Sequence, residues 1–192
     1  MKIGSNNSLT YLKPPRTWWL KIFYFLRKKQ DIDYEDQYVL YGIRVFDFRL
    51  YVDKHGRIVT RNNCDFSLYE ALNFLNKKGD AMVSISLDMS EVDYLANPNT
   101  TRIISSFIEK CRIIKTIYKN IKFYGGYRKF DKKVLYNFNN KVDNVIVIED
   151  ISKKYKFISI FCPFLLYNLN KKYIEQYKDS NKVIMLNYID KK

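Results

Sequence analysis

"YGIRVFDFRLYVDKHGRIV", residues 41–59, combines a strand pattern with two charges that share one face. Apolar side chains between residues 43 and 48 predict a buried strand. The "DKHG" that follows predicts a hairpin turn, and "GRIVT" predicts a short return strand. Asp47 and Arg49 stand two residues apart, so on a strand both side chains point to the same side. The stretch therefore predicts a carboxylate and a guanidinium that line one pocket or belong to one ion-pair network.

The rest of the chain alternates apolar strands with amphipathic helices. The helix at 67–79 is the clearest, because its apolar residues repeat at helical spacing and Gly79 follows them as a stop signal. Strands that alternate with helices predict an α/β fold with a mainly parallel sheet. With 192 residues the chain is long enough for a substantial core, which favours a single domain, 1–192. The other helix patterns cover 18–29, 100–119 and 171–180, and the other strand patterns cover 81–89, 120–126, 142–150 and 182–190.

The formal net charge of +14 favours acidic partners such as nucleic acid, anionic lipid or phosphate esters. The charge is scattered along the chain rather than gathered in a stripe, so nucleic acid is the least favoured of these partners. A composition rich in Lys and Asn explains the charge equally well without any partner. Hydrophobic residues make up 47% of the chain and aromatic residues 17%, which argues against a disordered protein.

Cysteine and histidine are too sparse for a metal centre or a disulfide framework. Cys64, Cys111 and Cys162 are far apart in the sequence, and His55 is the one histidine. The sequence therefore predicts reduced thiols, no metal site and no cofactor.

The sequence shows no secretory signal and no membrane-spanning segment, which favours a cytoplasmic protein. The longest apolar stretch, 157–169, contains Pro163 and is too short to cross a bilayer. Peripheral attachment is an alternative, because Trp18 and Trp19 stand among basic residues in the predicted helix 18–29. Packing of this helix against the rest of the domain is the favoured interpretation.

Four segments occur in an order that resembles a known family. They are "IGSNNSLTYL" at 3–12, "YEDQYVLYGIRVFDFRLYVDKHGRIV" at 34–59, "SLYEALNFL" at 67–75 and "AMVSISLD" at 81–88. Together they resemble the X domain of phosphatidylinositol-specific phospholipase C and its bacterial relatives. That family has G-[TS]-H-[DN]-S after its first strand and G-[VIA]-R-x-[FL]-[DE]-[IL]-[RD] in its second. The resemblance covers roughly residues 3 to 89.

The resemblance implies a phosphodiesterase barrel of the TIM type, with its site at the C-terminal ends of the strands. A chain of 192 residues is short for eight βα units, so we expect a short or incomplete barrel.

The two catalytic histidines of the family are replaced in this chain. Asn6 stands at the position of the first, and Arg61, with Asn62 as the alternative, stands at the position of the second. The family uses these histidines to move protons, but Asn does not exchange a proton at neutral pH and Arg stays protonated. The resemblance thus implies a degenerate phosphoric diester hydrolase that binds a phosphate ester or phosphoinositide head group, or serves as a scaffold.

Polar residues that match the family's pattern remain for ligand binding. Asn7 stands where the family has Asp or Asn, and Asp88 where it has Glu or Lys. Arg49 matches the arginine that replaces calcium in the metal-independent bacterial relatives, so the resemblance implies no calcium. Asp47, Arg49 and Asp88 form either a ligand site or a structural ion-pair network, and the two interpretations are equally weighted.

Two alternatives to a degenerate binding protein remain open. One is an active metal-independent phosphodiesterase with rearranged catalysts, for example His55 or Asp88 acting with Arg61, although a solvated turn residue is the favoured interpretation of His55. The other is a basic protein that binds a membrane surface or nucleic acid.

Overall fold

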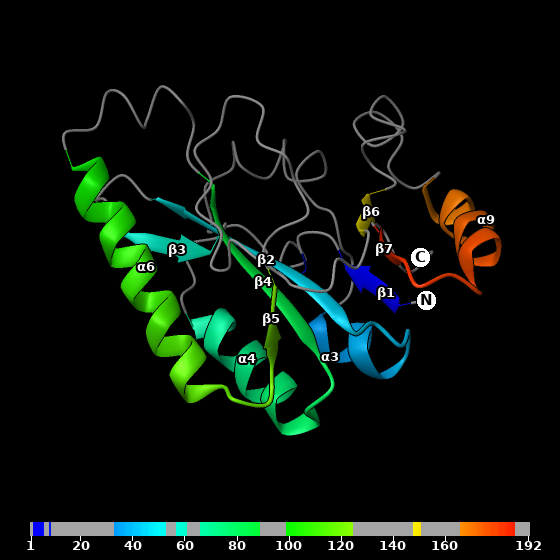
Figure 1. The fold of residues 1–192 in the computed structure, drawn as a ribbon, viewed down its shortest axis with the longest axis horizontal. Helices are drawn as coiled ribbons and strands as arrows, with labels where there is room; N and C mark the ends of the chain where they lie inside the picture. Colours follow the sequence, from blue (N-terminus) through cyan, green and yellow to red (C-terminus); the bar gives the residue numbers. More distant parts are fainter. Residues whose placement is uncertain are drawn as a thin grey trace, which may run out of the picture. The chain divides into compact units, whose positions relative to one another are not determined.

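The computed structural model describes residues 2–5, 8, 33–52, 57–60, 66–88, 99–124, 148–150 and 166–186 (Figure 1). Its elements in chain order are β1 (Lys2–Ser5), α3 (Tyr34–Val39), β2 (Val45–Val52), β3 (Ile58–Thr60), α4 (Phe66–Lys78), β4 (Met82–Asp88), α6 (Thr100–Ile117), β5 (Lys122–Phe123), β6 (Ile148–Asp150), α9 (Leu166–Tyr177) and β7 (Val183–Leu186).

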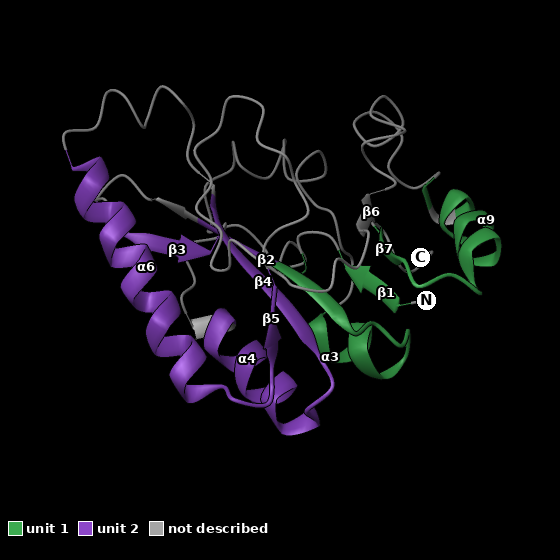
Figure 2. Cartoon of the chain, in the orientation of Figure 1, with its two compact units in different colours: residues 1–47, 144–192 green, residues 48–143 purple. Residues whose placement is uncertain are grey.

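The chain divides into two compact units, and β2 contributes residues to both (Figure 2). The first unit comprises residues 1–47 and 144–192, and the second comprises residues 48–143. Strand β2 begins in the first unit and continues into the second.

In the first unit, β1 lies between β2 and β7 and pairs in parallel with both. Strand β6 pairs in parallel with β7 on its other side, and α9 contacts β7. Gly4 of β1 permits close contact with both neighbours, because a Cβ atom at this position would collide with Met185 Sδ and crowd Val45. The chain segments from the two ends of the sequence therefore join in one parallel sheet.

A short helix, α3, precedes β2 in the same unit. The Asp33 side chain caps it by accepting a hydrogen bond of 2.8 Å from the Asp36 backbone N–H. The helix ends before Gly42, whose φ of 65° lies in the left-handed region that favours glycine. The side chain of Gln37 in this helix is fully buried, which brings a polar group to the end of β1.

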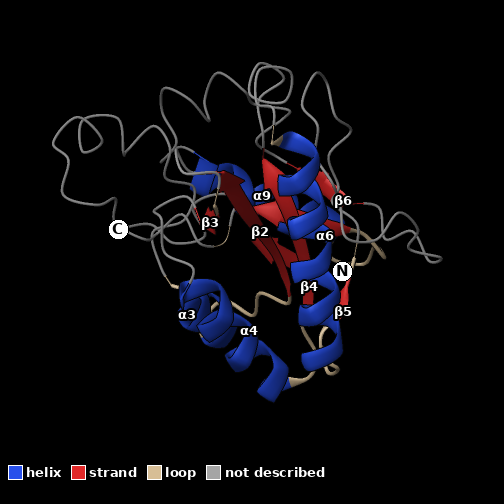
Figure 3. Cartoon of the chain, turned by 90° about the vertical axis from the view of Figure 1, so that its left-hand side faces the viewer, coloured by secondary structure: helices blue, strands red, loops and turns tan. Residues whose placement is uncertain are grey.

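In the second unit, β2 continues from Phe48 and pairs antiparallel with β3, as the predicted hairpin requires. Strand β4 pairs in parallel with β5. Helices α4 and α6 lie next to each other, as Figure 3 shows, and Asn120 after α6 makes two hydrogen bonds with Asn76 of α4, at 3.0 and 3.2 Å. Their buried side chains form much of the core of this unit: Leu68, Ala71, Leu72, Leu75, Ile103, Phe107, Cys111 and Ile114.

The predicted α/β class with a mostly parallel sheet is confirmed by this arrangement. Among the strands that the structure describes no closed barrel is seen, so the short or incomplete TIM-type barrel stays a prediction. The single domain over 1–192 also stays a prediction. No helix within the described ranges is long and apolar enough to cross a membrane.

Candidate functional site at the end of strand β1

Ser8 makes four hydrogen bonds, which link it to Ser5 of β1, Asp47 of β2 and Gln37 of α3. Its backbone N–H donates to the Asp47 carbonyl at 2.9 Å, and its hydroxyl accepts from the Asp47 N–H at 3.1 Å. The same hydroxyl donates to the Ser5 carbonyl at 2.9 Å, and the Ser8 carbonyl accepts from Gln37 Nε2 at 3.1 Å. Ser8 is thus linked to one residue in each of the elements β1, β2 and α3.

The four residues of this cluster are all buried. Ser5, Ser8 and Gln37 have no exposed surface, and Asp47 is 3% exposed. Burial of polar groups is costly unless they are hydrogen-bonded, and the bonds of Ser8 offset that cost for both backbone and side-chain groups. We call Ser5, Ser8, Gln37 and Asp47 the β1 polar cluster.

The Ser5 hydroxyl of the β1 polar cluster is available for a further hydrogen bond. Ser5 Oγ is fully buried and has no hydrogen-bond partner among the residues that the structure describes. A serine hydroxyl both donates and accepts, so a polar ligand atom at the end of β1 would satisfy it. Parallel α/β sheets bind their ligands at this end of the strands.

The predicted alternation of β2 is present. Asp47 is buried and Arg49 is half-buried, and both lie on the strand face opposite Phe46, Phe48 and Leu50, which are all buried. The charged pair therefore shares one face of a buried strand, as the sequence predicts.

Strand β4 repeats this alternation with smaller polar groups. Ser84 and Ser86 are buried on one face, and Val83, Ile85 and Leu87 are buried on the other. Ser84 Oγ also has no hydrogen-bond partner within the described residues. Asp88 ends the strand, and its side chain lies outside the described part of the chain. The proposed contact between Asp88 and Arg49 thus stays a prediction.

Several predicted site residues lie outside the described residues. These are Asn6, Asn7, Trp18, Trp19, His55 and Arg61. The sequence neighbours of Asn6 and Asn7, Ser5 and Ser8, are described, and the Ser8 hydroxyl donates to the Ser5 carbonyl. The roles assigned to all six residues stay predictions.

The structure adds two residues that the sequence did not single out, Ser8 and Gln37. Ser8 ends the "GSNNS" motif, and its place in that motif was the available signal. Gln37 stands in a short helix between two tyrosines, and nothing in its spacing distinguishes it from an exposed residue.

The described parts of the chain contain one buried thiol and few clustered titratable side chains. No group of three or more His, Cys, Asp or Glu residues lies close enough there to hold a metal ion. The Cys111 thiol lies in the core of the second unit, where burial raises its pKa to about 12. A thiol with that pKa stays protonated at neutral pH and is a poor nucleophile.

Comparison of the chain with models of known families, with curated proteins and with solved structures finds no significant match.

Proposed function

We propose that this protein is a degenerate phosphodiesterase that binds a phosphate ester, such as a phosphoinositide head group, without hydrolysing it. The observation that carries the proposal is the β1 polar cluster. It gives the end of β1 a rigid, buried polar setting at the segment that resembles the family's G-[TS]-H-[DN]-S motif.

The β1 polar cluster supports binding of a phosphate ester at the end of β1. Four hydrogen bonds fix Ser8, so the polar groups that it holds at the end of β1 are positioned before a ligand binds. The buried Ser5 hydroxyl supplies a further donor that is not used within the described residues. Polar donors that are held rigidly and away from water suit the oxygens of a phosphate ester.

Arg49 supplies the positive charge in this proposal. It lies on the same face of β2 as Asp47 and is half-buried. A guanidinium matches two phosphate oxygens at once, and a partly buried arginine binds them more strongly than an exposed one. Arg61, which stands at the position of the second histidine, is a second candidate for an anion-binding guanidinium.

Binding without turnover follows from the side chains available for proton transfer. Asn6 and Arg61 stand at the two positions where the resembling family has histidine, and neither transfers a proton at neutral pH. General acid–base catalysis contributes roughly 100- to 10,000-fold per group, so the loss of both groups removes most of the rate.

Calorimetric titration with inositol 1-phosphate tests the binding half of the proposal. We expect the wild type to bind and the Arg49→Ala variant to lose at least about tenfold in affinity, because a charged hydrogen bond contributes about 1.5–3 kcal/mol. Arg102→Ala is the matched control, since Arg102 is exposed on α6, and it should bind as the wild type does. Equal affinity of the wild type and Arg49→Ala would contradict the proposed site.

A further inference from the structure

Gly4 of β1 lies level with Val45 of β2 on one side and with Met185 of β7 on the other. A Cβ atom at Gly4 would collide with Met185 Sδ, and it would lie 3.1 Å from Val45 Cβ and 3.2 Å from the Val45 carbonyl oxygen. Ordinary contacts between carbon atoms are about 3.5–4.0 Å long. The space that β1 occupies between its two neighbours is therefore wide enough for glycine and too narrow for a residue with a Cβ atom.

Movement of a side chain alone does not relieve this crowding. Met185 and Val45 are fully buried, and the close packing of a protein interior leaves a buried side chain little room to rotate. One of the crowded Val45 atoms is its backbone oxygen, which moves only with strand β2. A Cβ atom at position 4 therefore displaces β1 relative to β2.

The position of β1 relative to β2 decides the geometry of the β1 polar cluster. Ser5 follows Gly4 directly, and its carbonyl accepts from the Ser8 hydroxyl at 2.9 Å. The Ser8 N–H donates to the Asp47 carbonyl at 2.9 Å, and the Asp47 N–H donates to the Ser8 hydroxyl at 3.1 Å. Because hydrogen bonds weaken steeply as they lengthen and bend, a displaced β1 does not keep all three bonds at once.

We propose that Gly4 and Met185, here called the Gly4–Met185 pair, are positioning residues of the phosphate site at the end of β1. Their close contact sets where β1 lies, and through Ser5 it sets where Ser8 meets Asp47. Met185 belongs to β7, so the site at the end of β1 depends on a strand near the other end of the sequence. The inference rests on the proposed function for its ligand, but the positioning itself is measurable without a ligand.

Amide hydrogen exchange of the Ser8 N–H measures the positioning directly, because a hydrogen bond to the Asp47 carbonyl protects this N–H. The Tyr118 N–H, which donates to the Ile114 carbonyl at 2.9 Å in the second unit, is the reference amide. We expect Gly4→Ala to speed up exchange at Ser8 by at least about tenfold relative to Tyr118. The reason is that a buried hydrogen bond is worth about tenfold in an opening equilibrium.

A second substitution separates the contact with Met185 from other effects of the Cβ atom. In a Met185→Ala background the new Cβ atom no longer meets Sδ, and the effect of Gly4→Ala on Ser8 exchange should fall below about threefold. Met185→Ala by itself leaves a cavity, so each effect is measured between variants that have the same residue at position 185. If Gly4→Ala alone does not fold, we expect the double variant to recover a cooperative thermal transition, and no recovery would contradict the contact.

Gly79→Ala is the matched control for the loss of a glycine. Gly79 has a φ of 81°, and a Cβ atom there would meet no atom of the described residues within 4 Å apart from its chain neighbours. The substitution therefore strains the backbone without displacing a strand. Exchange at Ser8 should change no more than exchange at Tyr118 in this variant.

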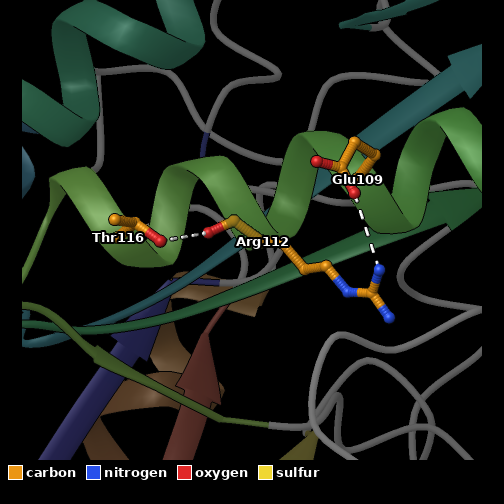
Figure 4. A network of polar contacts seen from close by, with 3 residues as sticks. All are labelled: Glu109, Arg112 and Thr116. Carbon is orange, nitrogen blue, oxygen red and sulfur yellow. Dashed lines mark hydrogen bonds and ion pairs between the residues drawn. The ribbon is translucent and has the colours of Figure 1, made fainter.

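Arg112→Ala on α6 is the control for charge. Arg112 forms an ion pair of 3.5 Å with Glu109, and its carbonyl, which the substitution retains, accepts a hydrogen bond of 3.0 Å from the Thr116 hydroxyl (Figure 4). Both charged side chains are largely exposed, so the ion pair contributes little to stability. Loss of this one positive charge should change neither Ser8 exchange nor the affinity for an anion.

Calorimetric titration with inositol 1-phosphate connects the positioning to the ligand. We expect Gly4→Ala to lose at least about tenfold in affinity and this effect to fall below about threefold in the Met185→Ala background. Equal Ser8 exchange in the wild type and Gly4→Ala, an equal effect of Gly4→Ala in both backgrounds, or an unchanged affinity of Gly4→Ala would each overturn the proposal. A wild type that binds no inositol 1-phosphate would contradict the proposed function instead, and the exchange measurements alone would then decide whether the Gly4–Met185 pair positions Ser8.

Discussion

Ser8 shows how a single side chain fixes a functional segment. Its hydroxyl accepts from the Asp47 N–H and donates to the Ser5 carbonyl, so one oxygen atom serves two backbone groups on different strands. All three residues are buried. The positions of Ser5, Ser8 and Asp47 relative to one another therefore depend on this one hydroxyl.

Ser8→Ala should lower the free energy of unfolding by about 1–3 kcal/mol, because it leaves a buried N–H and a buried carbonyl with fewer partners. Urea unfolding measures this loss. Ser106→Ala, on the exposed side of α6, is the control and should change stability by less than about 0.5 kcal/mol. Equal stability of Ser8→Ala and Ser106→Ala would mean that the hydroxyl bonds contribute nothing.

The charged residues of the site were predictable from the sequence, whereas the residues that hold the site together were not. Asp47 and Arg49 share a face because strands repeat every two residues, which is a local rule. Ser8 and Gln37 act through contacts with Asp47 and with each other across 39 and 29 residues of chain. Hydrogen bonds at such separations arise only once the tertiary fold has formed.

At the scale of elements, a helix with a strong hydrophobic repeat was predicted well from the sequence, whereas short helices and strands were not. The helix expected at 67–79 is α4, Phe66–Lys78, and it ends at Gly79 with a φ of 81°. Helix α3 was missed because its six residues are too few to show a helical repeat. The strand expected at 120–126 is described as only the two residues of β5. A six-residue helix and a two-residue strand depend on tertiary contacts more than on their own sequence.

Helix α6 makes a prediction about alkaline pH. Burial raises the pKa of the Cys111 thiol from 9.0 to about 12, so the folded protein keeps a proton that the unfolded chain loses above about pH 9. The unfolded state then binds fewer protons than the folded state, and stability falls as the pH rises between these two values. The Cys111 contribution to this slope is about 1.4 kcal/mol per pH unit.

Urea unfolding from about pH 8 to about pH 10 measures the slope, and Cys111→Ala is the comparison. We expect stability to decline less steeply above about pH 9 in the variant than in the wild type, because the variant has no thiol to ionise at this position. Parallel declines in the two proteins would show that Cys111 is not buried in the solution structure.

At the scale of the whole molecule, the alternation of strands and helices was sufficient to predict an α/β fold with a mostly parallel sheet. It was not sufficient to predict which strands are neighbours. Strand β1 pairs with β7, which follows it by about the full length of the chain, and Gly4 makes room for Met185 in that pairing. Only long-range packing decides such a pairing, and no local pattern records it.

The function proposed for the molecule combines two properties, binding of a phosphate ester and absence of hydrolysis. Phosphorus NMR of glycerophosphoinositol reports both in one experiment. Binding changes the position or width of the phosphodiester signal, and hydrolysis produces the separate signal of a cyclic phosphate or a monoester. We expect the phosphodiester signal to shift or broaden with the wild type and to stay unchanged with Arg49→Ala. We expect no product signal with the wild type, because Asn6 and Arg61 cannot exchange protons at neutral pH. Either an unchanged diester signal, or product formed at an ordinary enzymatic rate on the order of 10 per second, would contradict the proposed function.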